Sequence, residues 1–144
     1  MADTLNGPEL HSMTRELASG KNFAAVSTVL PSGGLQTQVL WVALEDEQLV
    51  INTETHRRRF KNLEQDPRIT VLIRDEQDPY RYAEVRGHVG RTETGDRARA
   101  QLDELAHKYL GSDYPPDAIK SERVLVYITP ERQTIIDQNE DTSD

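Results

Sequence analysis

Six runs of alternating or β-branched residues, most of them joined by short turns, constrain this chain to a mainly β fold. The runs cover residues 23–30, 35–44, 48–53, 69–74, 80–91 and 123–136. The turn at 31–34, Pro-Ser-Gly-Gly, supplies the positive φ that a hairpin between the first two runs requires. Hairpins pair neighbouring strands antiparallel, so we expect a six-stranded antiparallel β-barrel with peripheral helices.

Three further segments have helical periodicity, at residues 8–19, 57–65 and 96–110. The last has the clearest apolar stripe and is followed by Gly111, a residue that commonly ends helices. We expect this helix to cover one open end or face of the barrel. Pro130 lies inside the final strand and predicts an edge or a bend there.

Length and composition limit what kind of protein this is. The 144 residues suit one domain over 1–137, and the acidic stretch 138–144 is expected to be a disordered tail. A net charge of -8 argues against nucleic acid as a partner, and no apolar run reaches the roughly 20 residues of a membrane helix. The N-terminus does not resemble a secretory signal, so we expect a cytoplasmic protein.

The usual catalytic and metal-binding patterns are missing from the sequence. The chain has no cysteine, its four histidines lack metal-ligand spacing, and it contains no P-loop, Rossmann glycine motif or G-x-S-x-G elbow. We therefore expect no metal and assign no catalytic residue. An enzyme with this sequence has to take its chemistry from a cofactor.

One basic segment stands out on this acidic chain, between the end of a strand and the start of a helix. It carries Thr53 and Thr55, then Arg57, Arg58 and Arg59, then Lys61 without an acid from 56 to 61. Hydroxyls, arginines and the free N–H groups of a helix start together suit a phosphate. On charge alone, a solvated basic helix face paired with acids elsewhere is the alternative.

The register of this segment resembles that of the pyridoxamine-phosphate-oxidase-like split barrels, in which a strand ending in Thr leads to a basic pair and then to Lys-x-Leu. Here these are Thr53, Arg58-Arg59 and Lys61-Asn62-Leu63. Three further segments match this family in order and spacing. They are a Gln followed five residues later by Trp41, the stretch Tyr-Arg-Tyr-Ala-Glu-Val-Arg-Gly at 80–87, and Tyr-Leu-Gly-Ser-Asp-Tyr-Pro at 109–115. The chain is most similar to the F420-dependent branch of these FMN-binding-like split barrels.

Two departures separate the chain from the pyridoxamine phosphate oxidases themselves. Arg57 replaces a Ser, and the pair at 58–59 is Arg-Arg instead of Arg-Lys. The oxidases also end in a segment with Arg and Trp that closes over the substrate phosphate, whereas Trp41 is the only tryptophan here. The resemblance therefore does not extend to recognition of that substrate phosphate.

The resemblance implies a set of cofactor-binding residues. Arg57, Arg59 and Lys61 would face the phosphate, with Arg58 and Asn62 close by, and Asn52 and Thr53 would border the ring or the ribityl chain. Thr37, Gln38 and Val39 would contact the ring edge, and Tyr80 and Arg81 would reach in from the partner subunit of a homodimer. Trp41 is assigned to the core or the dimer interface, and Glu84 and Arg86 are expected to form an ion pair.

The implied activity is hydride transfer between coenzyme F420 and a small organic substrate. Arg57, Lys61 and Arg81 are the cations available to the oligoglutamyl tail of that coenzyme. Two alternatives remain. One is an FMN-binding oxidase or flavin reductase, because FMN and F420 share the ribityl phosphate. The other is a non-catalytic F420-binding protein, because no acid, base or nucleophile is recognisable.

Overall fold

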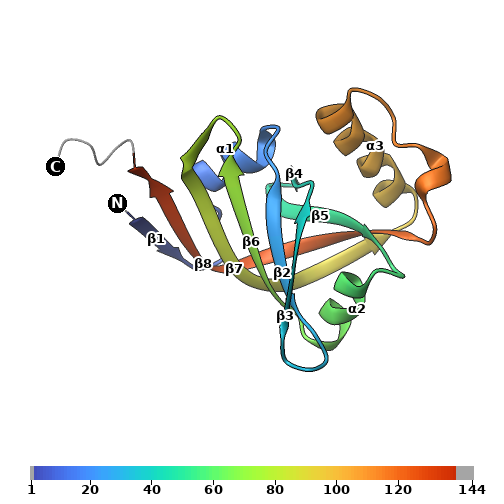
Figure 1. Cartoon of the computed structure of the whole chain (residues 1–144), viewed down its shortest axis with the longest axis horizontal. Coiled ribbons are helices and arrows are strands. Elements are labelled where there is room, and N and C mark those ends of the chain that lie inside the picture. Colours follow the sequence, from blue (N-terminus) through green and yellow to red (C-terminus); the bar gives the residue numbers. More distant parts are fainter. Residues whose placement is uncertain (1, 139–144) are drawn as a thin grey trace.

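A single antiparallel sheet of eight strands runs through the chain in the computed structural model, which describes residues 2–138 (Figure 1). Its strand order is β3-β2-β6-β7-β8-β5-β4, and β1 pairs with β8 outside this path. The sheet curls into a split barrel: β3 pairs with β2 and β4 pairs with β5, and the two edges do not pair with each other. The mainly β, antiparallel architecture with peripheral helices is the predicted one.

The elements follow one another with short connections. The strands are β1 (Ala2–Asn6), β2 (Ala24–Val29), β3 (Leu35–Leu40), β4 (Ala43–Glu45), β5 (Gln48–Glu54), β6 (Arg68–Asp75), β7 (Asp78–Thr94) and β8 (Arg123–Asp137). The helices are α1 (Ser12–Ser19), α2 (Arg58–Gln65) and α3 (Asp96–Leu110), with a single 3-10 turn η1 (Pro116–Ala118).

The strand count of six was wrong by two, for separate reasons. The predicted strand 35–44 breaks into β3 and β4 at Trp41 and Val42. At Val42 the backbone N–H and C=O both bond the hydroxyl of Tyr109, each at 3.2 Å, and so leave the ladder. Strand β1 has no alternating pattern of its own and exists because it pairs with residues 132–136 of β8. Helix α1 begins at Ser12 rather than at residue 8, after His11 caps it through Nδ1.

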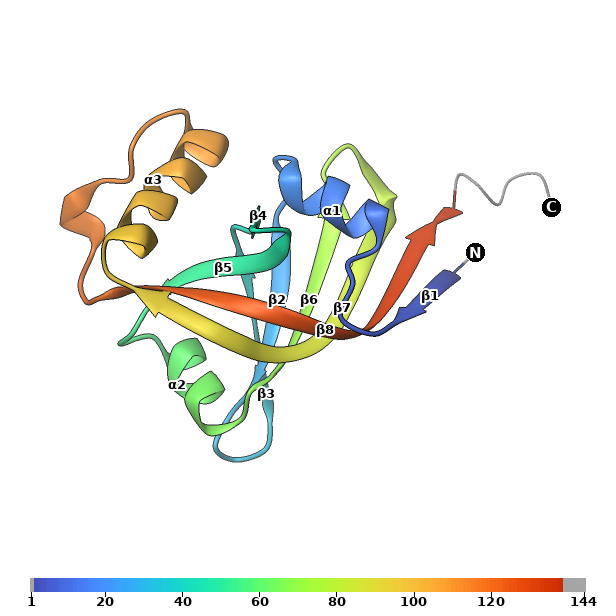
Figure 2. The same ribbon diagram turned by 180° about the vertical axis from the view of Figure 1, so that it is seen from behind.

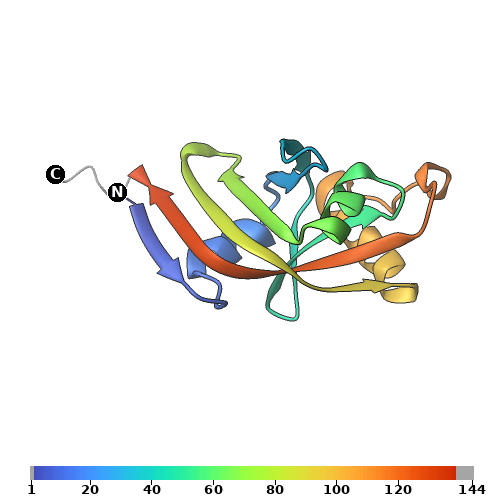
Figure 3. The same ribbon diagram turned by 90° about the horizontal axis from the view of Figure 1, so that it is seen from below.

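Strands β7 and β8 form a long bent ribbon at the centre of the sheet (Figure 3). The bend coincides with a register shift at Gly87, which lies opposite Pro130. A Cβ atom on Gly87 would lie 2.1 Å from the carbonyl oxygen of Thr129, so only glycine allows this close approach. The glycine that ends the Tyr-Arg-Tyr-Ala-Glu-Val-Arg-Gly stretch thus has a structural role, and Pro130 marks the predicted bend.

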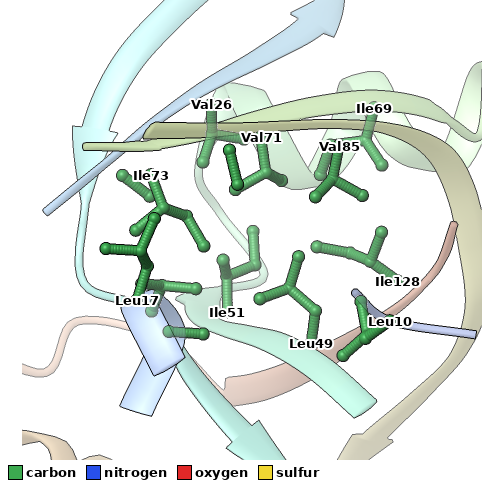
Figure 4. Packing of buried hydrophobic residues seen from close by; sticks show 14 of the residues in the cluster. Leu10, Leu17, Val26, Leu49, Ile51, Ile69, Val71, Ile73, Val85 and Ile128 are labelled. Atoms are coloured by element: carbon green, nitrogen blue, oxygen red, sulfur yellow. The ribbon is translucent and has the colours of Figure 1, made fainter. Parts of the chain in front are cut away.

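The hydrophobic core fills the inside of the curled sheet (Figure 4). Alternate residues of β2, β5, β6 and β7 point inward because successive side chains of a strand face opposite sides. Leu17 of α1 closes one side of this cluster, and its side chain is 1 % exposed. A smaller cluster of Val50, Ala98, Leu125 and Tyr127 joins α3 to the other side of the sheet.

Helices α2 and α3 lie toward the end of the β7–β8 ribbon that is remote from strand β1 (Figures 1 and 2). The bounds of α3 are those predicted, and Gly111 ends it in the left-handed conformation at φ 80. Between residues 2 and 138, no helix is long and apolar enough to cross a membrane. The predicted disordered tail, apart from Gln138, lies outside the described residues.

Candidate functional site

A cavity of about 260 Å³ opens where the start of α2, the inner face of α3 and the ends of three strands meet. Its walls come from five parts of the chain that are far apart in the sequence. They are Phe23, Val39, Leu40, Trp41, Asn52, Thr53, Arg57, Arg59, Leu102, Leu105, Tyr114 and Arg123. The cavity has a cationic end and an aromatic end, and these two ends differ in what they can bind.

Three arginines form the cationic end. Arg57 and Arg59 come from the start of α2, and Arg123 is the first residue of β8. Arg123 lies opposite Glu54 in the β5–β8 ladder, and its Nη1 atom is 3.6 Å from Oε2 of that carboxylate. Arg57 reaches the same oxygen at 3.8 Å. One carboxylate therefore faces two of the guanidinium groups, and Arg59 adds a third positive charge to this end of the cavity.

Of the three cavity arginines, Arg59 is the one without a counter-ion among residues 2–138. Its Nε atom is buried and has no hydrogen-bond partner. Among residues 2–138 no carboxylate lies within ion-pair distance of its guanidinium. Burial lowers the pKa of Arg59, and the nearby charges of Arg57 and Arg123 lower it further. A partly buried cation beside two others is costly unless an anion joins it, so an anionic group would suit this end of the cavity.

Asn52 fixes the position of Arg123. Its side-chain oxygen accepts a hydrogen bond from Arg123 Nε at 3.0 Å, and its backbone oxygen accepts one from Nη2 at 3.3 Å. Its amide nitrogen donates to the carbonyl oxygen of Ala98 and to Oε1 of Gln101, each at 2.9 Å. Strand β5, helix α3 and strand β8 thus meet at Asn52, and the Arg123 guanidinium is held in a defined place at the cavity wall.

The aromatic end is a cluster of four rings. Trp41 stacks on Tyr109 with ring centroids 5.2 Å apart and planes 4° from parallel. Tyr114 meets the edge of Trp41 at 6.1 Å, and Phe23 packs on Tyr109 at 5.2 Å. Three of these rings, all but Tyr109, line the cavity together with Leu102 and Leu105 and make an apolar wall, which suits a flat ring system.

Two residues of α3 hold the aromatic end in place. The Tyr109 hydroxyl donates to the carbonyl oxygen of Asn22 at 2.5 Å, and burial raises its pKa to about 12. Lys108 donates from Nζ to the carbonyl oxygens of Ala18 and Val42, each at 2.8 Å. No carboxylate of the described chain pairs with Lys108, and burial lowers its pKa to about 8.

The structure brings together five of the residues expected to bind a cofactor. Val39, Asn52, Thr53, Arg57 and Arg59 line the cavity, while Thr37, Gln38, Arg58, Lys61, Asn62, Tyr80 and Arg81 do not. Trp41, which was assigned to the core or the dimer interface, is part of the wall. The Glu84–Arg86 ion pair is confirmed, with Nε 2.9 Å from Oε1.

The predicted residues outside the cavity have varied surroundings. Asn62 is buried, and its amide nitrogen donates to Thr28 Oγ1 at 3.0 Å and to Gln36 Oε1 at 3.2 Å, which fastens α2 to the sheet. Arg58 and Lys61 lie exposed on α2. Thr37 and Gln38 are on β3, and the Thr37 hydroxyl is 2.8 Å from that of Ser27.

Tyr80 and Arg81 lie at the start of β7, away from this cavity. The Tyr80 side chain is 60 % exposed. Arg81 forms ion pairs with Glu16, Asp75 and Asp137. Three carboxylates therefore hold the Arg81 guanidinium within its own chain.

Arg123 and Tyr114 are the main cavity residues that sequence reasoning missed. Arg123 lies in no recognisable motif, and Tyr114 belongs to the Tyr-Leu-Gly-Ser-Asp-Tyr-Pro stretch at 109–115, which assigned it no role at the site. Only the pairing of β8 with β5 brings Arg123 beside Asn52 and Glu54, and only the turn after α3 brings Tyr114 to Trp41. An arginine at the start of a strand is a weak signal on its own. No group of three metal-ligating side chains occurs in the part of the chain that the structure describes.

Comparison with known proteins agrees with this architecture. The model of the family described as pyridoxamine 5'-phosphate oxidase matches residues 10–136. No curated protein matches the chain at a significant level. A solved structure described as an F420 reductase is 29% identical, covers 83% of this chain and 94% of its own, and superposes with a TM-score of 0.73.

More distant structures share the fold alone. A conserved hypothetical protein from Mycobacterium tuberculosis is 20% identical over 90% of this chain and 87% of its own, with a TM-score of 0.63. The heme storage protein HutZ from Vibrio cholerae is 12% identical over 89% of this chain and 94% of its own, with a TM-score of 0.59. The match to the family model spans almost the whole sheet and the cavity, and the chain belongs to the pyridoxamine 5'-phosphate oxidase family of split barrels.

Proposed function

We propose that this protein is an oxidoreductase that binds the phosphate of a flavin-like cofactor at Arg57, Arg59 and Arg123. The observation that carries the proposal is the buried, unpartnered Nε atom of Arg59 beside two further arginines. A phosphate oxygen would supply both the missing hydrogen-bond acceptor and the missing negative charge. Such a group would turn a repulsive cluster into a stabilised one.

The aromatic end supports a planar ring on the same ligand. Trp41, Tyr114 and the leucines of α3 offer flat apolar surface within the cavity whose other end is cationic. A ligand with an anionic group at one end and a heteroaromatic ring at the other matches this polarity. Flavins and deazaflavins have this form.

We favour coenzyme F420 as the cofactor. The F420 reductase structure supports this choice, because it is similar over most of both chains. Exposed Arg58 and Lys61 also support it: within residues 2–138 neither has an acidic partner, and both are available to an anionic tail outside the cavity. Arg81, the other candidate for the tail, is already paired with three carboxylates. FMN is the second candidate, because its phosphate suits the same arginines.

In this proposal the cofactor supplies hydride transfer, and the chain supplies binding and orientation. The arginines hold the anionic group, and Asn52 fixes Arg123 so that the ligand is bound in one place. The aromatic wall excludes water from one side of the ring. No side chain is assigned as acid or base, and the substrate is a small organic acceptor or donor.

We further propose that the protein is a homodimer. A cavity of about 260 Å³ falls below the usual range of roughly 300–1,000 Å³ for ligand sites, so one chain holds only part of the cofactor. The outward face of β2, β3 and β6 carries Leu35 and Val39, which are 70 % and 71 % exposed, and two hollows of about 430 and 180 Å³. A second copy on this face would bury the apolar surface and complete the site.

The test is equilibrium binding of F420 and, separately, FMN to the purified protein, followed by Trp41 and cofactor fluorescence. We expect micromolar or tighter binding of F420, quenching of Trp41, and turnover against a panel of reducible acceptors. Preference for FMN would replace F420 with the flavin. Tight binding without any turnover would leave a cofactor-binding protein, and binding of neither would refute the proposal.

A further inference from the structure

Glu54 lies next to Arg57 and Arg123 and is fully buried. Its Oε1 atom accepts hydrogen bonds from the backbone N–H groups of Lys120, at 2.5 Å, and Ser121, at 2.9 Å. These bonds tie the segment between α3 and β8 to the end of β5. Burial opposes ionisation of Glu54, but the two amides and the charge of Arg123 outweigh it and keep its pKa below the ordinary value. The carboxylate is therefore charged at neutral pH.

The second oxygen of Glu54 has a different environment. Oε2 has no hydrogen bond, and it lies 3.6 Å from Arg123 Nη1 and 3.8 Å from Arg57 Nη2. These distances are too long for hydrogen bonds, so Oε2 acts on both guanidinium groups through charge alone. Arg123 is already positioned by its two hydrogen bonds to Asn52. Glu54 is therefore not needed to aim that side chain.

We infer that Glu54 limits how tightly the cationic end of the cavity binds an anion, and so keeps the ligand exchangeable. When the cavity is empty, its negative charge offsets the mutual repulsion of the arginines. When an anion is bound to the arginines, the negative charge of Glu54 lies just beyond them and repels the anion. Both effects favour release. The inference rests on the proposed anion site and assigns Glu54 the role of setting its affinity.

Glu54→Gln separates this electrostatic role from a structural one. The amide oxygen of Gln can accept the same two backbone N–H groups, while the negative charge is lost. Glu122→Gln is the matched control, because it removes one carboxylate from the exposed side of the same segment and changes the net charge equally. Both variants are titrated with inorganic phosphate by thermal stabilisation, and then with FMN and F420 by fluorescence, from low to high salt.

We expect Glu54→Gln to melt at a lower temperature than the wild type without ligand and to bind each phosphate-bearing probe about tenfold more tightly at low salt. The gain should shrink as salt screens the charges, and Glu122→Gln should bind like the wild type. Equal or weaker binding of phosphate by a folded Glu54→Gln protein would overturn the inference. A purely structural role for Glu54 would give weaker binding with no change in salt dependence.

A double variant guards against a failure to fold. Glu54→Gln combined with Arg57→Gln restores the original local charge, so it should fold, and it should bind phosphate more tightly than the Arg57→Gln single variant because the repulsion from Glu54 is gone. Equal affinity of the double variant and Arg57→Gln for phosphate would contradict the charge argument. Inorganic phosphate also separates the two proposals: an effect on phosphate without binding of F420 or FMN would support the role of Glu54 and refute the proposed cofactors.

Discussion

Arg123 lies directly opposite Glu54 in the β5–β8 ladder, and the two side chains form a partly buried ion pair at 3.6 Å. This relationship joins the last strand of the chain to the segment that carries Arg57 and Arg59. It also partly offsets the positive charge at this end of the cavity, because the Glu54 carboxylate lies near the guanidinium groups of both Arg123 and Arg57.

Replacing Arg59 with Gln should weaken cofactor binding. Loss of one charge-assisted hydrogen bond corresponds to about 1.5–3 kcal/mol, or roughly ten- to a hundredfold in Kd. Stability without ligand should stay the same or rise, because the substitution removes a partly buried cation that two neighbouring arginines repel. Fluorescence titration and thermal melting measure the two effects. Arg58→Gln, on the exposed side of α2, is the control; an unchanged Kd in Arg59→Gln would remove this arginine from the site.

Replacing Gly87 with Ala should destabilise the fold. The new Cβ would lie 2.1 Å from the Thr129 carbonyl oxygen, so β7 and β8 would have to separate at their bend. We expect a loss of several kcal/mol in the free energy of unfolding, measured by denaturant titration. Gly34→Ala is the control, because its Cβ would meet nothing closer than 3.4 Å. A Gly87→Ala protein as stable as this control would contradict the close approach.

Replacing Tyr109 with Phe should loosen the aromatic end of the cavity. The change removes the hydroxyl that bonds Asn22 and Val42, and it leaves the buried Val42 N–H without a partner. We expect a loss of about 1–3 kcal/mol in stability and a shift in Trp41 fluorescence, since Trp41 stacks on this ring. Tyr80→Phe, on an exposed side chain, should change neither property. An unshifted Trp41 spectrum in Tyr109→Phe would argue against this support.

Lys108 should make stability depend on pH in the alkaline range. Its pKa is about 8 in the folded protein and 10.5 when unfolded, so between these values the unfolded state binds more protons. The free energy of unfolding of the wild type, minus that of Lys108→Met, should therefore rise from pH 8 to 10.5. Denaturant titrations of both proteins over this range measure the difference. A flat or falling difference would show that Lys108 titrates normally.

Replacing Leu35 with Glu should disrupt the proposed homodimer. The substitution places a charge on the exposed apolar face of β3, where a second copy would have to desolvate it. Sedimentation equilibrium should show a dimer for the wild type and a shift toward monomer for the variant, with weaker cofactor binding. Leu110→Glu, on another exposed leucine at the end of α3, is the control. Loss of the dimer in the control alone would place the interface on α3.

Much of the fold could be predicted from the sequence, because local patterns decide it. The alternation of apolar residues, the turn at Gly33 and the end of α3 at Gly111 each depend on residues that are close together in the sequence. Helix α3 accordingly has its predicted bounds. The basic start of α2 is also local, so Arg57 and Arg59 could be selected from their register after Thr53. Their positive charge also predicts that the ligand near them is anionic.

The tertiary structure alone decided the rest. Val42 leaves its strand because Tyr109, from a distant helix, bonds its backbone, and β1 is a strand only because β8 pairs with it. Arg123 reaches the site through the β5–β8 register. Asn62 instead bonds Thr28 and fastens α2 to the sheet, and Arg81 forms ion pairs with carboxylates of its own chain. The local sequence determines conformation and charge, whereas long-range strand pairing determines which charged side chains lie close together. An anion site requires several cationic side chains close together, so only the tertiary structure could define it.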